Sequence, residues 1–297
     1  MLKLEPKYNV AVLLAAYNGR AWIEEQIITI RSQIGVSVTI FISLDKSTDG
    51  SACFISEIAP TYDLKILPCH GRLGGAAKNF FRLIKDVDFS SFDYVALADQ
   101  DDIWLPQKLL RGCDELQRTG ASGYSSNVIA FWPDGRQKLI NKAQKQTKYD
   151  HLYESPGPGC TFILRTDDLC ALKIFLNEHH EKINQVDLHD WFLYAWCRSS
   201  GRTWIIDDVP TMFYRQHGSN QVGANEGMSA LVRRLKMLRS GWYKAEIAKL
   251  CELCKAHGTV PAFVETPRRL SLLPRAFKLR RRFRDKLAII VIIILNF

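Results

Sequence analysis

The 297-residue sequence predicts an α/β fold, with a mostly parallel, Rossmann-like sheet and flanking helices. Short apolar runs alternate with segments of helical spacing through the first half of the chain. The first run, Val10–Ala16, is apolar throughout, which is typical of a strand buried on both faces. Polar residues follow the first, second and fourth runs. They therefore meet at the edge of the sheet where such folds bind ligands.

The elements of this half follow in order. Arg20–Gln33 is expected to be a helix because Ile23, Ile27 and Ile30 recur every three or four residues, and the strand Val36–Leu44 comes next. The remaining elements are the helix Ser51–Ala59, the strand Leu64–Leu67, the helix Ala76–Val87 after Gly74-Gly75, the strand Tyr94–Ala98 and the helix Gln107–Gln117 after Pro106.

The second half is less regular. Lys138–Lys148 is basic and polar, and we interpret it as a mobile surface loop. The expected elements after it are the strand Cys160–Leu164, the helix His189–Cys197, and the short strands Trp204–Ile206 and Thr211–Tyr214. From Met228 onward the pattern is helical and basic.

The composition indicates a globular protein with an anionic partner. Hydrophobic residues make up 47% and charged residues 24%, and the formal net charge is +9. Such a charge suits nucleic acid, a phosphate-bearing substrate or an anionic membrane. Nucleic acid is not expected, because the basic residues gather near the C-terminus and not in a stripe with aromatic residues. The eight cysteines show no disulfide framework, which favours reduced thiols in the cytoplasm.

The C-terminal region suggests a peripheral attachment to a membrane. Leu287–Phe297 is a mostly apolar tip, too short to span a bilayer, which needs about 20 residues. A basic cluster precedes it, and such a combination binds anionic lipid surfaces. The alternative is a last core element with its arginines in solvent. No secretory signal is recognised at the start of the chain.

Acidic residues follow two of the strands. Asp99-Gln100-Asp101-Asp102 places three carboxylates within four residues, which repel one another unless cations offset them. Mg²⁺ and Mn²⁺ prefer such oxygen ligands and often bridge to phosphates, so we expect one of these ions here. The alternative is an acidic loop that caps the next helix. Asp45 and Asp49 follow the second strand, where a carboxylate contacts a nucleotide or caps a helix.

Several segments together resemble a known family. They are LLAAYNGRAWIEEQI, SLDKSTDGS, LGGAAKNFFRLI, ALADQDDIWLPQKL, GCTFILR, HDWFLYAW and YRQHGSNQVG. In this order they resemble family 2 glycosyltransferases, most of all the bacterial rhamnosyltransferase-type members that build surface polysaccharides such as O-antigen or capsule. The resemblance runs from about residue 9 to residue 224. It implies a GT-A fold and inverting transfer of a sugar from a sugar nucleotide.

The resemblance also implies roles for individual residues. Asp190 matches the family's catalytic base, and Asp45 matches the acid that contacts the nucleotide base. The expected metal ligands, for Mn²⁺ or Mg²⁺, are Asp99, Asp101 and His217. The expected nucleotide-sugar-binding residues are Ala16, Tyr17, Asn18, Asp45, Lys78, Asn79, Asp99 and Gln100. Two motifs depart from the common pattern, because Asp45-Lys46 stands for Asp-Asp and His189-Asp190 for Glu-Asp.

The resemblance implies a donor and a catalytic domain, and the basic, apolar-tipped C-terminal region indicates a lipid-linked acceptor and a separate helical region. We expect a catalytic domain over residues 1–227, with a nucleotide-sugar half over about 9–120 and an acceptor half over about 121–227, and a basic helical region with an apolar tip over 228–297. The expected donor is a dTDP- or UDP-sugar, with dTDP-rhamnose the first choice. The expected acceptor is a saccharide linked to undecaprenyl diphosphate, at the cytoplasmic face of the bacterial inner membrane or in the cytoplasm.

Two alternatives stay open. Asp187 is a rival for the base, because it precedes Asp190 by about one helical turn. A nucleotidyltransferase or phosphohydrolase would use the same acidic loop with a metal. Pyrophosphorylases, however, usually carry a glycine-rich basic loop after the first strand, and Ala15–Arg20 lacks one.

Overall fold

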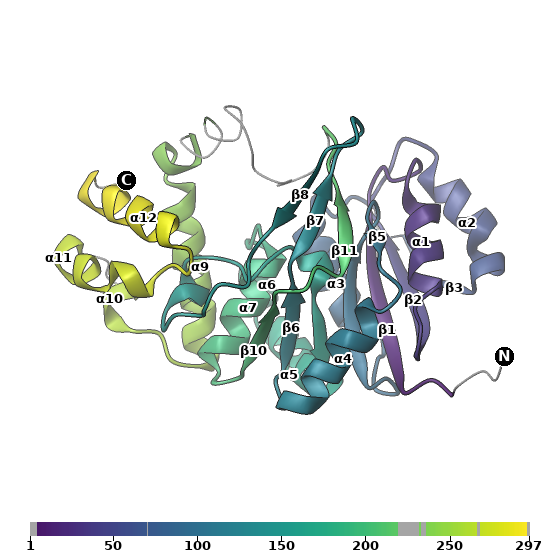
Figure 1. Ribbon diagram of the computed structural model, residues 1–297, viewed down its shortest axis with the longest axis horizontal. Helices are drawn as coiled ribbons and strands as arrows, with labels where there is room; N and C mark the ends of the chain where they lie inside the picture. The colour runs from purple at the N-terminus through teal and green to yellow at the C-terminus, as the bar shows by residue number, and fades with distance from the viewer. Residues whose placement is uncertain (1–4, 70, 219–231, 233–235, 266–267, 296–297) are drawn as a thin grey trace.

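The computed structural model describes residues 5–69, 71–218, 232, 236–265 and 268–295. Within these residues a seven-stranded sheet has the order β10-β6-β9-β4-β1-β2-β3 (Figure 1). Its strands are β1 (Tyr8–Ala16), β2 (Val36–Leu44), β3 (Leu64–Ile66), β4 (Tyr94–Asp99), β6 (Gly123–Ser126), β9 (Ile163–Arg165) and β10 (Trp204–Asp207). Neighbouring strands are parallel except at β9, which runs antiparallel to both β4 and β6. The predicted, mostly parallel sheet is therefore confirmed.

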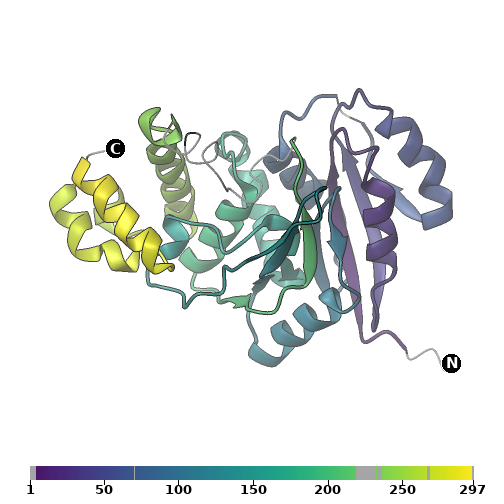
Figure 2. The same ribbon diagram turned by 45° about the horizontal axis from the view of Figure 1, so that its top comes forward.

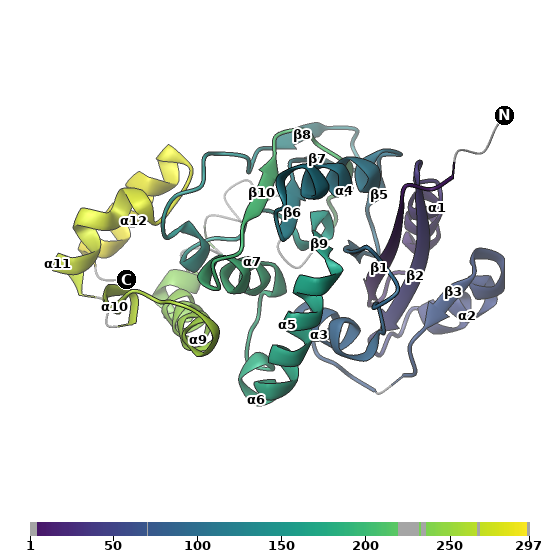
Figure 3. The same ribbon diagram turned by 90° about the horizontal axis from the view of Figure 1, so that it is seen from below.

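Two helical layers cover this sheet. The helices α3 (Ala76–Asp86), α5 (Thr166–Glu178) and α7 (His189–Ser199) share one apolar cluster, and α1 (Ile23–Arg31), α2 (Ser51–Tyr62) and α4 (Lys108–Thr119) share another. Figure 3 shows α3, α5 and α7 on the side of the sheet away from α1 and α4. Leu13 of β1 lies in the first cluster and Leu14 in the second. Alternate side chains of β1 thus enter both cores, which explains its unbroken apolar run.

A second, four-stranded sheet has the order β5-β11-β7-β8. Its strands are β5 (Ile103–Trp104), β7 (Val128–Phe131), β8 (Gln137–Ile140) and β11 (Met212–Arg215). β5 begins just after the acidic loop at the end of β4, and β11 ends just before His217. Because β5 and β11 pair, this small sheet brings His217 to the acidic loop from more than a hundred residues away.

The C-terminal helices pack on the second half of the chain. They are α9 (Trp242–His257), α10 (Ala262–Glu265), α11 (Arg269–Leu272), a 3₁₀ helix (Leu273–Lys278) and α12 (Phe283–Leu295), whereas the short α6 (His180–Ile183) lies before α7 and belongs to the first apolar cluster. Figure 2 shows the last of these at the end of the molecule opposite the N-terminal strands. They share a third apolar cluster with Leu152 and Tyr153. Among the described residues, no helix is long and apolar enough to cross a membrane.

Three expectations for the second half were wrong. The strand expected at Cys160–Leu164 begins only at Ile163, because Gly159–Thr161 forms a 3₁₀ turn. The segment Lys138–Lys148 is not only a loop: its first residues belong to β8, whose polar side chains face solvent at a sheet edge and hide the strand signal. The alternative for the apolar tip, a core element with its arginines in solvent, was wrong for one arginine, since Arg281 is 4% exposed.

A helix of the structure was not predicted, and part of the predicted C-terminal region lies outside the described residues. The helix α5 was not expected, because its hydrophobic residues do not form one clear stripe. In the basic stretch after Met228, Arg233 and Arg234 lie outside the described residues, as do the last two residues of the apolar tip.

Candidate active site

One large cavity, of about 2300 Å³, opens at the carboxyl ends of β1, β2 and β4. All of the site residues expected from the sequence line it: Ala16, Tyr17, Asn18, Asp45, Lys78, Asn79, Asp99, Gln100, Asp101, Asp190 and His217. From there the cavity continues past α7 to α9 and α12. The strand order therefore brings together residues that are up to two hundred positions apart in the sequence.

At the end of β1, a side-chain amide holds the loop in place. The Gln100 amide accepts from the Tyr17 backbone N–H and donates to the Tyr17 carbonyl, both at 2.7 Å. Asn18 has a φ of 48°, in the left-handed region that Asn tolerates better than most residues. Its side-chain oxygen accepts from the Thr48 N–H at 2.8 Å, and its own N–H donates to Ser47. Tyr17 thereby stays 54% exposed at the cavity mouth.

Asp45 at the end of β2 fixes the loop before α3. Its carboxylate accepts from the backbone N–H groups of Leu73 and Gly74, at 2.7 and 2.9 Å. These bonds align the start of α3, where the exposed Lys78 lies beside Gly74. The Asp45 carboxylate thus binds protein backbone at the edge of the cavity.

Asn79, next in α3, is not at the surface. Its side-chain N–H group donates to the carbonyls of Ala16 and Ser43, at 3.3 and 3.0 Å, and so joins the ends of β1 and β2. The side chain is 3% exposed, and its Oδ1 has no hydrogen-bond partner within the described structure. The amide therefore supports the cavity floor from below.

The acidic loop and His217 meet at the centre of the cavity. His217 Nε2 lies 2.6 Å from Asp101 Oδ2, and the imidazole stacks on Trp22 with 4.2 Å between ring centroids. Burial, with the charge of Asp101 second, raises the pKa of Asp99 to about 7. A buried carboxylate whose pKa is raised in part by the charge of a neighbouring carboxylate is stabilised by a cation.

Two residues that the sequence did not single out as ligands complete this cluster. Ligand atoms of Asp99, Asp102 and Cys160 all lie within 4.8 Å of one another. Asp102 Oδ2 is buried without a hydrogen-bond partner in the described structure, and burial raises the pKa of Asp102 well above its ordinary value. The carboxylates and the imidazole fit Mg²⁺ or Mn²⁺, whereas the Cys160 thiol, whose pKa burial raises well above its ordinary value, is not a ligand that these ions prefer. The doublet Asp101-Asp102 was visible in the sequence, but nothing local indicated the approach of Cys160.

A buried lysine lies behind the acidic loop. Lys108, at the start of α4, is 1% exposed, and its ammonium group lies 4.3 Å from the ring centroid of Trp104. Burial lowers its pKa to about 8, while the charge of Asp102 acts in the opposite direction. Its positive charge partly offsets the carboxylates from the protein side.

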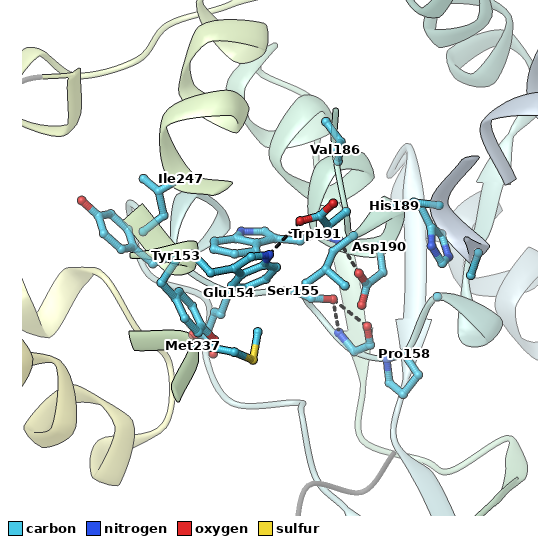
Figure 4. Close-up of a pocket in the computed structure, with 18 of the residues that line it drawn as sticks. Tyr153, Glu154, Ser155, Pro158, Val186, His189, Asp190, Trp191, Met237 and Ile247 are labelled. Atoms are coloured by element: carbon cyan, nitrogen blue, oxygen red, sulfur yellow. Dashed lines mark hydrogen bonds between the residues drawn. The ribbon is translucent and has the colours of Figure 1, made fainter. Parts of the chain in front are cut away.

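Asp190 occupies the first turn of α7 and faces the cavity (Figure 4). Its Oδ1 accepts from the Trp191 N–H at 2.8 Å, and Ser155 lies beside the carboxylate. Burial raises the pKa of Asp190 above its ordinary value, although hydrogen bonds from Ser155 and Trp191 oppose this. A carboxylate with a raised pKa is a stronger base, as proton abstraction requires.

Asp187, the rival for this role, is engaged elsewhere. Its Oδ2 accepts from the Trp242 ring N–H at 2.7 Å and lies 3.7 Å from Lys249 Nζ. The side chain is thus held by α9, while Asp190 lines the cavity close enough to Asp99 for their charges to interact. The geometry favours Asp190 as the base.

His189 packs beneath the site. Its ring stacks on Phe80 with centroids 4.1 Å apart, and burial lowers its pKa to about 3, so it is neutral. Gly159 passes directly over it: a Cβ atom there would lie 2.3 Å from His189 Nε2. This contact requires glycine and explains the turn at Gly159–Thr161.

Sequence comparisons agree with this arrangement. The model described as Glycosyl transferase family 2 matches residues 11–181, more than half of the chain. The chain is 42% identical over 290 residues to the dTDP-rhamnosyl transferase RfbG of Shigella flexneri, which covers 95% of this chain and 99% of that protein. It is 25% identical over 230 residues to an uncharacterized glycosyltransferase of Nostoc sp., over 71% of this chain and 66% of that protein.

A solved structure shares the fold. S. aureus TarS 1–349 in complex with UDP superimposes on 91% of this chain and 72% of that chain, with a TM-score of 0.58 and 14% identity. At this identity the likeness shows the fold alone, which is the GT-A fold that the motifs implied. With a family model over more than half of its length and a relative 42% identical over nearly all of it, the chain belongs to glycosyl transferase family 2 and is a nucleotide-sugar glycosyltransferase.

Proposed function

We propose that this enzyme is an inverting, metal-assisted rhamnosyltransferase that uses dTDP-rhamnose. The observation that carries the donor is the 42% identity, over 95% of the chain, to a protein named for dTDP-rhamnosyl transfer. The cavity supports the reaction type, because it holds one candidate base and one cluster of candidate metal ligands. A UDP-sugar is the alternative donor, and its binding is an outcome of the test below.

In this mechanism Asp190 takes the proton from an acceptor hydroxyl as that oxygen attacks the anomeric carbon of the donor. The bond from that carbon to the nucleoside diphosphate breaks on the opposite side, and the configuration inverts. Asp99, Asp101 and His217 would hold Mn²⁺ or Mg²⁺. When bound, the ion supplies positive charge toward the leaving diphosphate.

The remaining expected residues shape the donor end. The loop that Gln100 and Asn18 hold presents Tyr17 at the mouth, and Asp45 and Lys78 line the same end of the cavity. We assign the nucleoside to this end. The acceptor then approaches from the side of Asp190, which opens toward α9 and α12.

We further propose a lipid-linked acceptor, and attachment at the cytoplasmic face of the inner membrane. On α12, Leu287, Val291 and Ile294 are each about half exposed and recur at helical spacing, so they form an apolar stripe on the outer face. This supports residues 228–297 as a membrane-facing region beside the catalytic residues 1–227. This proposed boundary separates two functions and does not separate two independently packed units, because the two regions share the third apolar cluster.

Calorimetry of nucleotide binding tests the proposal. Wild-type protein is titrated with dTDP, UDP and GDP, with and without Mn²⁺ or Mg²⁺. We expect metal-dependent binding of dTDP, weakened at least about tenfold by Asp101→Ala, because a metal ligand is lost. Asp190→Asn should bind dTDP normally and yet transfer rhamnose at least about a hundredfold more slowly, because only the base is lost.

The outcomes separate the parts of the proposal. Tight binding of UDP in place of dTDP would replace the donor and leave the transferase standing. If dTDP bound with the same affinity with and without the metal ion, the metal would be excluded from the proposed mechanism. Full transfer activity in Asp190→Asn would exclude Asp190 as the base.

A further inference from the structure

The cavity contains a cationic subsite that the donor does not need. Beyond Asp190, it is lined by Lys142, Arg280 and Arg282. Next to them the wall becomes apolar, with Leu272, Ala288 and Ile292 from α11 and α12. The same cavity thus holds a candidate carboxylate base, a group of cations and an apolar wall.

The protein balances the cations of this subsite only in part: Glu154 and Asp285 line the same cavity and act on Lys142, against the three cations. The charge of Arg281 is paired with the buried carboxylate of Asp150, at 2.9 Å. Glu154 is shared between Arg280 and Arg281, at 3.8 and 3.7 Å. For Lys142 and Arg282, the described structure offers no carboxylate within 4.0 Å.

Lys142 is held in an unfavourable place for a lone ammonium group. Burial lowers its pKa, and the positive charge of Arg281 adds to the effect. A bound anion reverses both effects, because it pairs with the ammonium and offsets the arginines. The Asn127 side-chain oxygen accepts from the Lys142 N–H at 2.6 Å. This bond holds the Lys142 backbone, from which the side chain extends.

The subsite adjoins the reaction centre. The alkyl part of Lys142 lies against Gly157, with its Cβ and Cγ 3.9 Å from the position of a Cβ there. Ser155, which precedes Gly157 and bonds to it, lies beside Asp190. An anion at Lys142 therefore belongs to the molecule whose hydroxyl reaches Asp190, which is the acceptor.

We propose that Lys142, Arg280 and Arg282 bind the diphosphate of a polyprenyl-diphosphate-linked acceptor, and that Ala288 and Ile292 receive its first isoprene units. This inference rests on the proposed function and names the part of the acceptor that the site recognises. The occupant is one acceptor molecule inside the cavity and not the headgroups of the bilayer. Those headgroups meet the outer stripe of α12, on a different face of that helix.

A binding experiment with the full chain tests this. The protein is first saturated with dTDP and Mn²⁺, which fills the donor end, and then titrated with farnesyl diphosphate, farnesol or pyrophosphate. We expect farnesyl diphosphate to bind more tightly than either fragment, because it engages both the cations and the apolar wall. Lys142→Ala should weaken it about tenfold or more, and Lys142→Arg should restore most of the loss.

Lys145→Ala is the matched control. It removes the same side chain three residues away, where it is exposed and outside the cavity lining, and farnesyl diphosphate should bind as in the wild type. Normal dTDP binding by Lys142→Ala shows that the variant is folded. Arg282→Ala gives a second, independent loss at the rim of the subsite.

Unchanged farnesyl diphosphate binding in both Lys142→Ala and Arg282→Ala would overturn the inference. So would an equal loss of binding to phosphatidylglycerol vesicles in Lys142→Ala, because the cations would then recognise bulk headgroups. Failure of the proposed function looks different: the wild type would not bind dTDP with metal at all.

Discussion

Burial acts in opposite directions on two neighbouring residues of α7. It lowers the pKa of His189 to about 3 and raises the pKa of Asp190, because in each case the charged form is disfavoured. The histidine is therefore a neutral packing residue, stacked on Phe80, while the aspartate becomes a better base. This difference separates two side chains that look equally catalytic in the sequence.

The neutral state of His189 makes stability depend on pH. The unfolded chain protonates this histidine below about pH 6.5, whereas the folded chain resists until about pH 3. Stability is therefore lost as the pH falls below 6.5, by roughly 2 kcal/mol between pH 7 and pH 5. We expect His189→Gln to abolish the part of this pH-dependent loss that is due to the histidine. Urea unfolding at pH 7 and pH 5 measures the free energy of unfolding of each variant.

The control for this measurement is His180→Gln, at an exposed position. It should leave the difference between pH 7 and pH 5 as it is in the wild type. If His189→Gln and the wild type lose the same stability on acidification, the buried histidine is not the cause.

Among the elements, the loop after β1 depends on one side chain. Gln100 bonds to both backbone groups of Tyr17, and the backbone of Gly19 lies so close that a Cβ there would be 2.2 Å from Gln100 Oε1. The loop and the acidic turn thus form one rigid unit at the donor end. Their positions cannot vary independently.

Replacing this amide should weaken donor binding without unfolding the protein. In Gln100→Ala the Tyr17 backbone loses both bonds, so the loop must be ordered by the ligand itself, and we expect the Kd for dTDP to rise about three- to tenfold. Gln107→Ala, an exposed glutamine at the start of the next helix, should bind dTDP as the wild type does. Calorimetry measures both, and equal affinities would show that the clamp is dispensable.

The sequence predicts elements best where burial is symmetrical. The strands β1, β2 and β4 were predicted within two residues, because their apolar runs report burial on both faces. By contrast β8 and β9 were lost or shifted, since one is a polar edge strand and the other has only three residues. The antiparallel direction of β9 is set by its pairing with β4 and β6. The spacing of residues within β9 carries no information about that direction.

The residues of the site also differ in how well the sequence predicts them. The acidic loop stands out because three carboxylates follow one strand, and Asp190 stands out because it matches a motif of the family that the chain resembles. Cys160 and Lys142 do not, because their importance comes only from neighbours that are distant in the sequence. The burial of Arg281 against Asp150, 131 residues away, likewise has no local signal.

At the scale of the whole molecule, the outer stripe of α12 predicts how the enzyme meets a membrane. The double variant Leu287→Glu/Val291→Glu places two charges on this stripe, and we expect partition onto phosphatidylglycerol vesicles to fall at least about tenfold. Co-sedimentation measures it. Point variants are preferable to deletion of residues 278–297, which would also remove Arg281 and leave Asp150 without that partner.

Ile174→Glu is the control for the membrane measurement. Ile174 is 60% exposed on α5, which lies apart from α12 (Figure 3), so a charge there should leave vesicle binding intact. Equal partition of the double variant and the wild type would exclude the stripe as the membrane contact.

The ion pair between Asp150 and Arg281 also has a consequence for synthesis. Asp150 is fully buried, and it is translated 131 residues before Arg281. While the chain is still being made, this carboxylate has Arg198 and Tyr194 nearby but lacks its closest cation. The region around Asp150 therefore gains its strongest ion pair only after the ribosome has delivered the C-terminal helices.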